Sequence, residues 1–317
     1  MTDDAPLLVL KIDVDTYRGT REGVGNLVRM LKGHEANATF LFSLGPDHTG
    51  WALRRAFRPG FFQKVSRTSV VEHYGIKTLM YGTLLPAPDI GRDCAAEMHE
   101  VASAGFECGI HTWDHVQWQD NVRTRDAEWT TRMMRQAAHR FSSIFGDAPL
   151  THGAAGWQMN QAAFAEHDAA GYQYASDGRA LLNDNGTLRD PQAGPYRITG
   201  LRCIQLPTTL PTLDEVLGRE IDGVTLATGN IAAWLLKLTA GATRDHVYTL
   251  HAELEGQKLA PIFDELLAGW KAQGYRLASM ADLYQKVKDQ PLPDYPVQWG
   301  EMPGRSGELV VLNTAGG

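Results

Sequence analysis

The sequence predicts an α/β fold, a distorted barrel of about seven β-α units with a long amphipathic insertion after the second strand. Apolar runs such as 7–10 lead directly into polar residues, as expected of buried parallel strands that present functional side chains at their carboxyl ends. A strand, a helix and a second strand open the chain, which implies a parallel sheet with right-handed crossovers. Because such units recur as far as residue 277, a barrel is favoured over an open sheet.

The expected elements follow one another in chain order. The first helix rests on Val24, Leu27, Val28 and Leu31, which recur at helical spacing, and the second strand is expected at 38–43. Further helices are expected at 93–104, 128–145, 161–170, 231–238 and 259–274, and further strands at 106–111, 172–177, 203–207, 247–251 and 275–277. The Gly-, Pro- and Asn-rich stretch 184–200 is expected to be a loop or hairpin. We therefore expect one domain over 1–289 and a poorly ordered tail over 290–317.

The composition is that of an ordinary globular protein, with 317 residues of which 43% are hydrophobic and 21% are charged. A net charge of −7 argues against a nucleic-acid partner, because the phosphate backbone is normally met by a basic field. Cys94, Cys108 and Cys203 are too few and too irregularly spaced for a disulfide framework or a zinc ribbon. The sequence has no signal-peptide pattern and no run of about 18 apolar residues, so we expect a cytosolic protein whose membrane contact is peripheral.

The insertion at 45–91 combines aromatic and basic side chains, and no Asp or Glu occurs between His48 and Val71. This pattern is typical of a surface helix that lies on an anionic membrane, but it also fits an amphipathic lid over an active site. One element could serve both purposes. The residues expected to contact a membrane are Trp51, Arg54, Arg55, Phe57, Arg58, Phe61, Phe62 and Lys64.

Asp13 and Asp15 follow the first strand and are two residues apart, so both side chains point to the same face of an extended chain. Two carboxylates held this close do not stay equivalent, since one can coordinate a cation while the other is free to take a proton. His111 and His115 follow the third strand at a spacing that lets two imidazoles reach one cation. A carboxylate and two imidazoles form a metal site that leaves open positions for water and substrate.

His251 ends the last strong strand and would enter the same mouth of the barrel. A histidine there suits a general acid that protonates a departing amine. The mixed nitrogen and oxygen ligands suit zinc, manganese, cobalt or iron, so the sequence predicts one divalent metal ion without choosing among them.

These motifs resemble the polysaccharide deacetylase superfamily, also called the NodB-homology or carbohydrate esterase 4 group. Asp-x-Asp, His-Thr-x-x-His and Leu-x-His occur in that order, and the resemblance covers about residues 7–285. Within the superfamily the chain is most similar to the branch of deformylases that act on 4-deoxy-4-formamido-L-arabinose linked to undecaprenyl phosphate. The strings that carry this closer resemblance are 11–23 (KIDVDTYRGTREG), 154–157 (AAGW), 210–212 (LPT), 214–216 (DEV) and 248–253 (YTLHAE).

The resemblance implies the NodB-type barrel and hydrolysis of an N-formyl group from that lipid-linked sugar, in the pathway that adds aminoarabinose to lipid A. It implies that Asp15, His111 and His115 bind the metal. Asp13 would be the base and His251 the acid, with Asp177 orienting or tuning His251. The partners implied are the polyprenyl-phosphate-linked formamido sugar and the cytoplasmic face of the inner membrane.

One departure from the superfamily pattern concerns Asp13. The usual Arg-x-Pro-Tyr motif, whose arginine steadies the catalytic aspartate, is replaced by 154–157, and Arg179 is a candidate substitute. A backbone N–H near Gly156 and Trp157 is expected to hold the oxyanion, a contribution of about 3 kcal/mol for such a donor. Thr208 and Glu253 are further candidates for contact with the substrate or the oxyanion.

Two other functions remain open from the sequence. One is a deacetylase of N-acetyl sugars from the same superfamily, and the other is a non-catalytic protein that binds a lipid phosphate. The basic insertion favours the deformylase, because a polysaccharide enzyme would more often be exported and carry a signal peptide. The five polar side chains needed for turnover argue against the binding protein.

We expect charge reversal of Arg54, Arg55 and Arg58 to weaken binding to anionic liposomes, because each basic residue near such a surface contributes about 1 kcal/mol. Liposome co-sedimentation measures the effect, with metal content as the control that should not change. Unchanged sedimentation of the triple variant would remove the membrane hypothesis.

Overall fold

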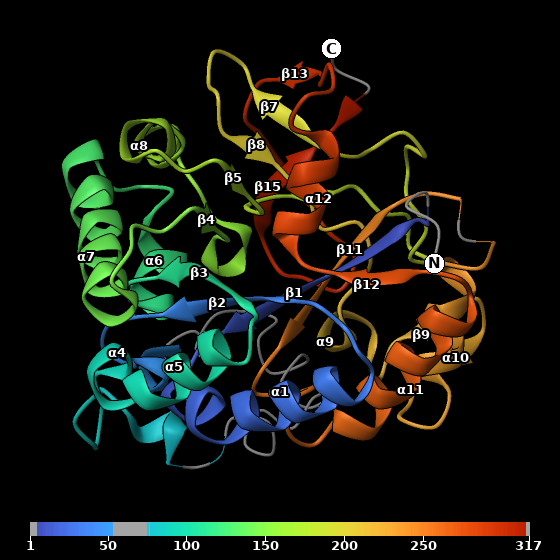
Figure 1. Cartoon of the computed structure of the whole chain (residues 1–317), viewed down its shortest axis with the longest axis horizontal. Coiled ribbons are helices and arrows are strands. Elements are labelled where there is room, and N and C mark those ends of the chain that lie inside the picture. Colours follow the sequence, from blue (N-terminus) through green and yellow to red (C-terminus); the bar gives the residue numbers. More distant parts are fainter. Residues whose placement is uncertain (1–4, 53–74, 76, 242, 315–317) are drawn as a thin grey trace.

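A curled, mostly parallel sheet forms the centre of the protein (Figure 1). The computed structural model describes residues 5–52, 75, 77–241 and 243–314. Seven parallel strands follow one another in the order β11-β1-β2-β3-β4-β5-β8. Their bounds are β1 Leu7–Val14, β2 Thr39–Ser43, β3 Glu107–Thr112, β4 Thr151–His152, β5 Tyr174–Ala175, β8 Ile204–Gln205 and β11 His246–His251. The predicted α/β barrel-like fold is confirmed.

The two ends of this series of strands meet through the segment after β8. The Thr209 N–H donates to the Val247 carbonyl over 2.9 Å, and the Val247 N–H donates to Thr209 Oγ1 over 2.9 Å. The ring is therefore closed by a short hydrogen-bonded contact, while a full strand ladder is absent between β8 and β11 in the described residues. This irregular closure is what makes the barrel distorted.

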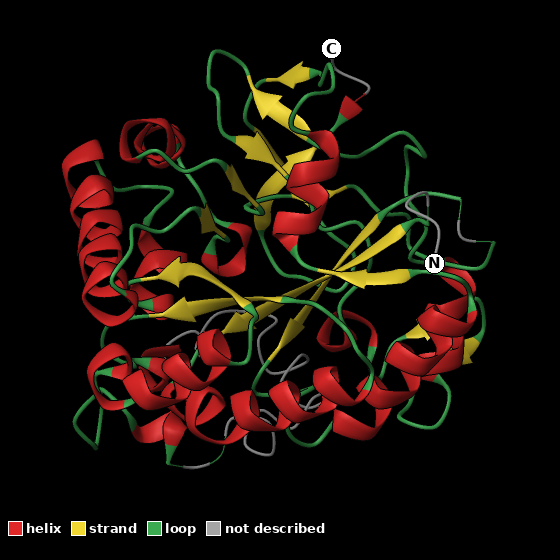
Figure 2. Cartoon of the chain, in the orientation of Figure 1, coloured by secondary structure: helices red, strands yellow, loops and turns green. Residues whose placement is uncertain are grey.

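Helices cover the outside of the sheet, and α1, α5, α10 and α11 lie in a row below β1 and β2 in Figure 2 as in Figure 1. Among the described residues the α-helices are α1 Val24–Gly33, α4 Ile90–Asp93, α5 Ala95–Ser103, α6 His115–Asn121, α7 Ala127–Phe145, α8 Gln161–Ala170, α9 Leu213–Val216, α10 Ile231–Leu238, α11 Ala260–Ala272 and α12 Met280–Val287. A π-helical turn, Gly19–Gly23, precedes α1, and the 3-10 turns Thr78–Met80 and Ala155–Trp157 lie in loops. No helix in the described part of the chain is both long and apolar enough to span a bilayer.

The strand β1 is buried on both faces. Because its side chains point alternately to the two faces of the sheet, they pack into two separate cores. Leu8, Leu10, Ile12 and Val14 pack in the large core beneath the helices. Leu7 and Val9 pack in a second core with α12, whose Met280, Leu283 and Val287 lie against the inner face of the sheet. Because side chains alternate, Lys11 and Asp13 continue this inner row toward the carboxyl end of β1.

The expectation of a poorly ordered tail after residue 290 is wrong for the described residues to 314. The strands β13 Asp294–Tyr295, β14 Gln298–Glu301 and β15 Glu308–Leu312 all pair with others. β14 and β15 form an antiparallel hairpin, and β15 pairs in parallel with β6, Arg179–Ala180. The prolines and glycines at 291–307 only mark turns, whereas 308–312 (ELVVL) is an apolar strand with its last four residues buried. This β14–β15 hairpin brings the end of the chain back to the barrel.

Smaller elements complete the fold. β7 Tyr196–Ile198 lies in the stretch expected to be a loop or hairpin and pairs with β8 in antiparallel fashion, while β9 Glu220–Ile221 pairs with β10 Val224–Thr225. The three cysteines carry free thiols, two of them buried.

Of the expected membrane contacts in the insertion, only Trp51 falls among the described residues. Its indole stacks on His48 with ring centroids 3.8 Å apart and donates to the Gly82 carbonyl over 2.6 Å. The expected contacts at Arg54, Arg55, Phe57, Arg58, Phe61, Phe62 and Lys64 lie outside the described residues.

Candidate metal and catalytic site

Asp15, His111 and His115 converge beyond the carboxyl ends of β1 and β3. His111 Nε2 lies 3.1 Å from Asp15 Oδ1, and His115 Nε2 lies 3.5 Å from Asp15 Oδ2. The three ligand atoms all lie within 4.8 Å of one another. The structure therefore brings together the three residues that the sequence predicts as metal ligands.

Three features of this cluster fit a divalent cation. His111 Nδ1 contacts the Gly153 carbonyl at 2.6 Å, and since a carbonyl only accepts, the proton is on Nδ1 and the lone pair on Nε2. Nε2 of His111 and Oδ1 of Asp15 are buried, face one another and have no hydrogen-bond partner. Burial alone would raise the pKa of Asp15, but the imidazoles of His115, His111 and His251 outweigh it and hold this pKa well below its usual range. An ionised carboxylate is the form that binds a metal ion.

Glu253 contacts the backbone at Asp15 and Thr16. Its Oε1 accepts hydrogen bonds from the Asp15 N–H at 3.1 Å, the Thr16 N–H at 2.8 Å and the Thr16 hydroxyl at 2.8 Å. Glu253 was a candidate for substrate contact, but this oxygen orients the backbone of a predicted ligand. A Cβ on Gly19 would lie 1.9 Å from the same oxygen, so only glycine fits there.

Asp13 is held by Lys11, which is also on the inner face of β1. Lys11 Nζ donates to Asp13 Oδ2 over 3.0 Å, and both side chains are buried. Asp13 Oδ1 has no hydrogen-bond partner and lies 3.6 Å from His111 Nδ1. One oxygen of Asp13 is thus anchored and the other is available to a water or a substrate.

The expectation that Arg179 partners Asp13 is wrong. Arg179 lies in β6, where its guanidinium pairs with Glu215 and donates to the Leu210 carbonyl over 3.0 Å. Sequence reasoning missed Lys11, although a signal was present. Lys11 precedes Asp13 by two residues in one strand, a spacing that places both side chains on the same face.

His251 stands beside Asp13 because the two residues are register partners in the β1–β11 ladder. Its backbone N–H donates to Glu255 Oε2 over 2.9 Å. Burial alone would lower the pKa of His251, but Asp214, Asp15, Glu255 and Asp13 outweigh it and raise this pKa to about 9. The imidazole is therefore protonated at neutral pH, as a proton donor requires.

The expectation that Asp177 orients His251 is also wrong. Asp177 Oδ1 lies 2.7 Å from His152 Nδ1 and accepts from the Ala154 N–H at 2.9 Å. Its Oδ2 accepts from Gln205 Nε2 at 3.1 Å and lies 3.5 Å from His167 Nδ1. His152, His167 and Asp177 are a second group of metal-ligand type, fully buried, but the carboxylate already meets four partners. We interpret this buried group of His152, His167 and Asp177 as a structural support for the loop that begins at Ala154.

That loop carries Gly156 and Trp157, both with positive φ, 62° and 53°. The Trp157 N–H donates to the Ala154 carbonyl over 2.9 Å, so it is not the expected oxyanion donor, and the Gly156 N–H remains the candidate. The Trp157 indole N–H lies 3.4 Å from Thr208 Oγ1, which is buried and bonded to Thr249 Oγ1 at 2.7 Å. Thr208 therefore supports Trp157, in place of the predicted contact with substrate.

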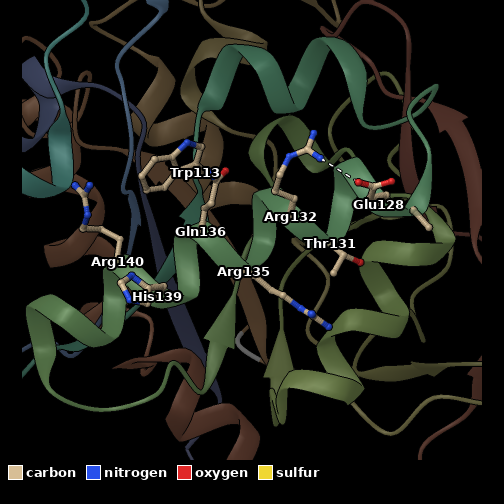
Figure 3. A pocket seen from close by; sticks show the side chains of 9 residues that line it. Trp113, Glu128, Thr131, Arg132, Arg135, Gln136, His139 and Arg140 are labelled. Atoms are coloured by element: carbon tan, nitrogen blue, oxygen red, sulfur yellow. Dashed lines mark ion pairs between the residues drawn. The ribbon is translucent and has the colours of Figure 1, made fainter.

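A groove runs along the outer face of α7. It measures about 780 Å³ and meets the site only at Trp113, which lies between the two predicted histidine ligands (Figure 3). Its arginines are paired with acids: Arg132 faces Glu128 at 3.8 Å, and Arg135 bonds Glu166 at 2.7 Å. None of the residues that line this groove is a predicted catalytic residue.

Comparisons with known proteins agree on the fold and on one group of relatives. No protein-family model matches the chain. The chain is 33% identical over 301 residues to a Shewanella sediminis (strain HAW-EB3) protein named "probable 4-deoxy-4-formamido-L-arabinose-phosphoundecaprenol deformylase ArnD", covering 95% of this chain and 92% of that one. A Wigglesworthia glossinidia brevipalpis protein of the same name is 30% identical over 290 residues, covering 91% and 96%.

Two solved structures show the same fold at low sequence identity. One is a polysaccharide deacetylase-type protein from Mycobacterium smegmatis, with a TM-score of 0.62 and 14% identity over 95% of this chain and 97% of that one. The other is a protein of the same type from Pseudomonas aeruginosa PAO1, with a TM-score of 0.58 and 12% identity over 91% and 93%. Both support the NodB-type barrel predicted from the motifs.

We expect Lys11→Met to lower kcat by about 100-fold, because Asp13 loses the partner that orients it as a base. The variant should also lose about 3–5 kcal/mol of unfolding free energy, the usual cost of leaving one charge of a buried pair alone. Steady-state kinetics and urea denaturation measure the two effects.

A double variant separates orientation from folding. In Lys11→Met with Asp13→Asn the buried charge is gone, so stability should return toward wild type while activity stays low. Wild-type kcat in folded Lys11→Met would contradict the role of the pair.

Proposed function

Because this chain belongs to the family of 4-deoxy-4-formamido-L-arabinose-phosphoundecaprenol deformylases (ArnD), we propose that it removes the N-formyl group from that lipid-linked sugar and releases formate. The chain is an amide hydrolase of the deformylase and deacetylase class. The lipid-linked substrate is the one that its relatives' names state. The proposal places the reaction in the modification of lipid A with aminoarabinose, at the cytoplasmic face of the inner membrane.

The observation that carries this proposal is the pairing of Asp13 with His251 beside the Asp15, His111 and His115 cluster. A deformylase needs a base for the attacking water and an acid for the departing amine, on either side of the carbonyl carbon. Adjacent parallel strands hold these two side chains next to each other, and the cluster lies at the same end of the sheet. This geometry supports hydrolysis over simple binding.

Asp15, His111 and His115 would hold one divalent cation. When bound, such an ion supplies a Lewis acid that polarises the formyl oxygen and lowers the pKa of a water molecule. The unpartnered Asp15 Oδ1 and His111 Nε2 support this assignment. The donor set of one carboxylate and two imidazoles is compatible with zinc, manganese or cobalt.

Asp13 would accept the proton of the attacking water on Oδ1. Lys11 keeps Oδ2 occupied, so the unbonded Oδ1 is the oxygen that can take a proton. His111 Nδ1 is 3.6 Å from Oδ1, too far for a strong hydrogen bond that would compete for it.

His251 would donate its proton to the sugar nitrogen as the C–N bond breaks, because an amide nitrogen cannot leave as an anion at neutral pH. The carboxylates around it, with Asp214 first among them, keep the imidazole protonated. We assign the Gly156 N–H to the developing oxyanion, since the neighbouring Trp157 N–H is already bonded within its turn.

We expect the purified protein to release formate from the formamido-arabinose lipid phosphate, and chelation to abolish the release. Add-back of zinc, manganese or cobalt one at a time should restore it and identify the ion that serves best. His111→Ala should lower turnover by about 1,000-fold or more and reduce bound metal, because a ligand is lost. His139→Ala, an exposed histidine of α7, is the matched control and should behave as wild type.

Other outcomes decide between the alternatives. Acetate released from N-acetyl sugars, with no formate from the formamido lipid, would favour a deacetylase and overturn the proposed substrate. Absence of both bound metal and hydrolysis would favour a lipid-phosphate binding protein.

A further inference from the structure

The β14–β15 hairpin covers the side chain of Trp157, which is only 1% exposed. The hairpin also holds the next residue, because Gln158 Nε2 donates to the Glu308 carbonyl over 2.7 Å. Three apolar residues of the hairpin pack with Trp157 in one cluster, namely Met302, Leu309 and Val311. The far end of the chain therefore fixes the place of this ring.

The turn of the hairpin adds a cation beside the same ring. Gly304 has φ +87°, and a Cβ on it would lie 2.3 Å from the Glu215 carbonyl, so the turn packs closely on α9. The next residue, Arg305, places its guanidinium 4.3 Å from the centroid of the Trp157 ring. Its Nε donates to Glu215 Oε1 over 2.6 Å, which fixes the guanidinium in that place. The hairpin thus restrains Trp157 by apolar packing and by a cation–π contact.

The Trp157 ring also contacts the lysine that holds the proposed base. Lys11 Nζ lies 5.1 Å from the ring centroid, within the range of a cation–π contact. Lys11 is fully buried, and its ammonium carries three N–H donors. Within the described part of the chain, its hydrogen bond is the one to Asp13 Oδ2 at 3.0 Å. The electron-rich face of Trp157 is therefore a second group that attracts this buried charge.

Packing confines the stem of Lys11 on another side. A Cβ on Gly153 would lie 2.7 Å from Lys11 Cε and 2.4 Å from Leu41 Cδ1, so no space separates the stem from this backbone. Packing restrains the stem, whereas Asp13 and the Trp157 ring restrain the ammonium at its end.

We propose that Trp157 is a positioning residue for the base: held by the β14–β15 hairpin, its ring keeps the Lys11 ammonium on Asp13 Oδ2 and so leaves Oδ1 for the attacking water. The inference rests on the proposed function, because it assigns a role within the hydrolysis. It also gives the β14–β15 hairpin a part in the reaction, beyond its pairing with β6.

A double-variant cycle in the full-length, metal-loaded protein tests this route. Formate release from the formamido-arabinose lipid phosphate gives kcat and KM for wild type, Trp157→Leu, Lys11→Met and the double variant. Trp157→Leu should lower kcat by about tenfold with little change in KM, because Lys11 keeps its charge but loses the ring. Bound metal and the urea midpoint of each variant show that it is folded and loaded.

The double variant decides whether Trp157 acts through Lys11. Lys11→Met alone is expected to lower kcat by about 100-fold, and adding Trp157→Leu should lower it no further, since residues that act as one unit are not additive. A loss of about 1,000-fold in the double variant, the product of two independent effects, would reduce Trp157 to a structural residue and overturn the inference.

Two milder variants serve if Trp157→Leu does not fold. Trp157→Phe keeps an aromatic face and should recover most of the wild-type kcat. Arg305→Met removes the cation of the hairpin from the ring and should lower kcat by about threefold, with no further loss when Lys11→Met is also present. Loss in Trp157→Phe as large as in Trp157→Leu, or full additivity of Arg305→Met with Lys11→Met, would also contradict the inference.

Arg123→Met is the matched control for Arg305→Met. Arg123 lies 4.6 Å from the ring centroid of Trp299, another tryptophan of the same hairpin. Trp299 packs in a different apolar cluster from Trp157. This variant should therefore keep the wild-type kcat and add nothing to the loss in Lys11→Met.

The wild-type rate separates this inference from the proposed function. Formate release by the wild type, with additive losses in the cycle, would overturn the role of Trp157 and leave the deformylase reaction standing. A wild-type protein that releases no formate would overturn the proposed function, and this inference with it.

Discussion

The pairing of β1 with β11 on one side and with β2 on the other is the constraint on which the site depends. This parallel register makes Asp13 and His251 direct neighbours and aligns the ends of β1, β2 and β3 at one edge. A slip of one residue in β1 would turn Asp13 toward the helices and bring Ile12 into the barrel. The large core on the outer face, with Leu8, Leu10 and Ile12 fully buried, opposes such a slip.

The same register places charged side chains in the buried interior. Each of the following has a partner of opposite charge. Lys11 meets Asp13, and Arg179 and Arg305 meet Glu215. These three cations also surround the Trp157 ring, at 5.1, 4.6 and 4.3 Å from its centroid. A buried charge without a partner costs several kcal/mol, so these pairs offset part of the cost of placing charges inside the barrel. Trp157 thereby joins the proposed base, the β6 strand and the C-terminal hairpin in one contact region.

Three of the buried aspartates have two different kinds of surroundings. Asp13 and Asp15 lie within 3.6 Å of the predicted ligand His111, and Asp13 is the register partner of His251. Asp177 faces His152, His167 and a backbone N–H, and it shapes the loop that carries Gly156. Sequence position alone does not distinguish these surroundings, because Asp13, Asp15 and Asp177 all lie at or just beyond the carboxyl end of a strand of the same sheet.

The amino-acid sequence by itself determined the barrel, the order of its elements and the meeting of Asp13, Asp15, His111, His115 and His251. Strand periodicity and the rule that parallel strands present their carboxyl ends together are local or topological, so a sequence carries them. Only the tertiary structure decided other partners: Asp177 faces His152, and Asp214 pairs with Arg305, from a segment predicted to be a loose tail. Such pairings join residues up to 91 positions apart, and they depend on how α9, β6 and the β14–β15 hairpin pack, which no spacing in the sequence encodes.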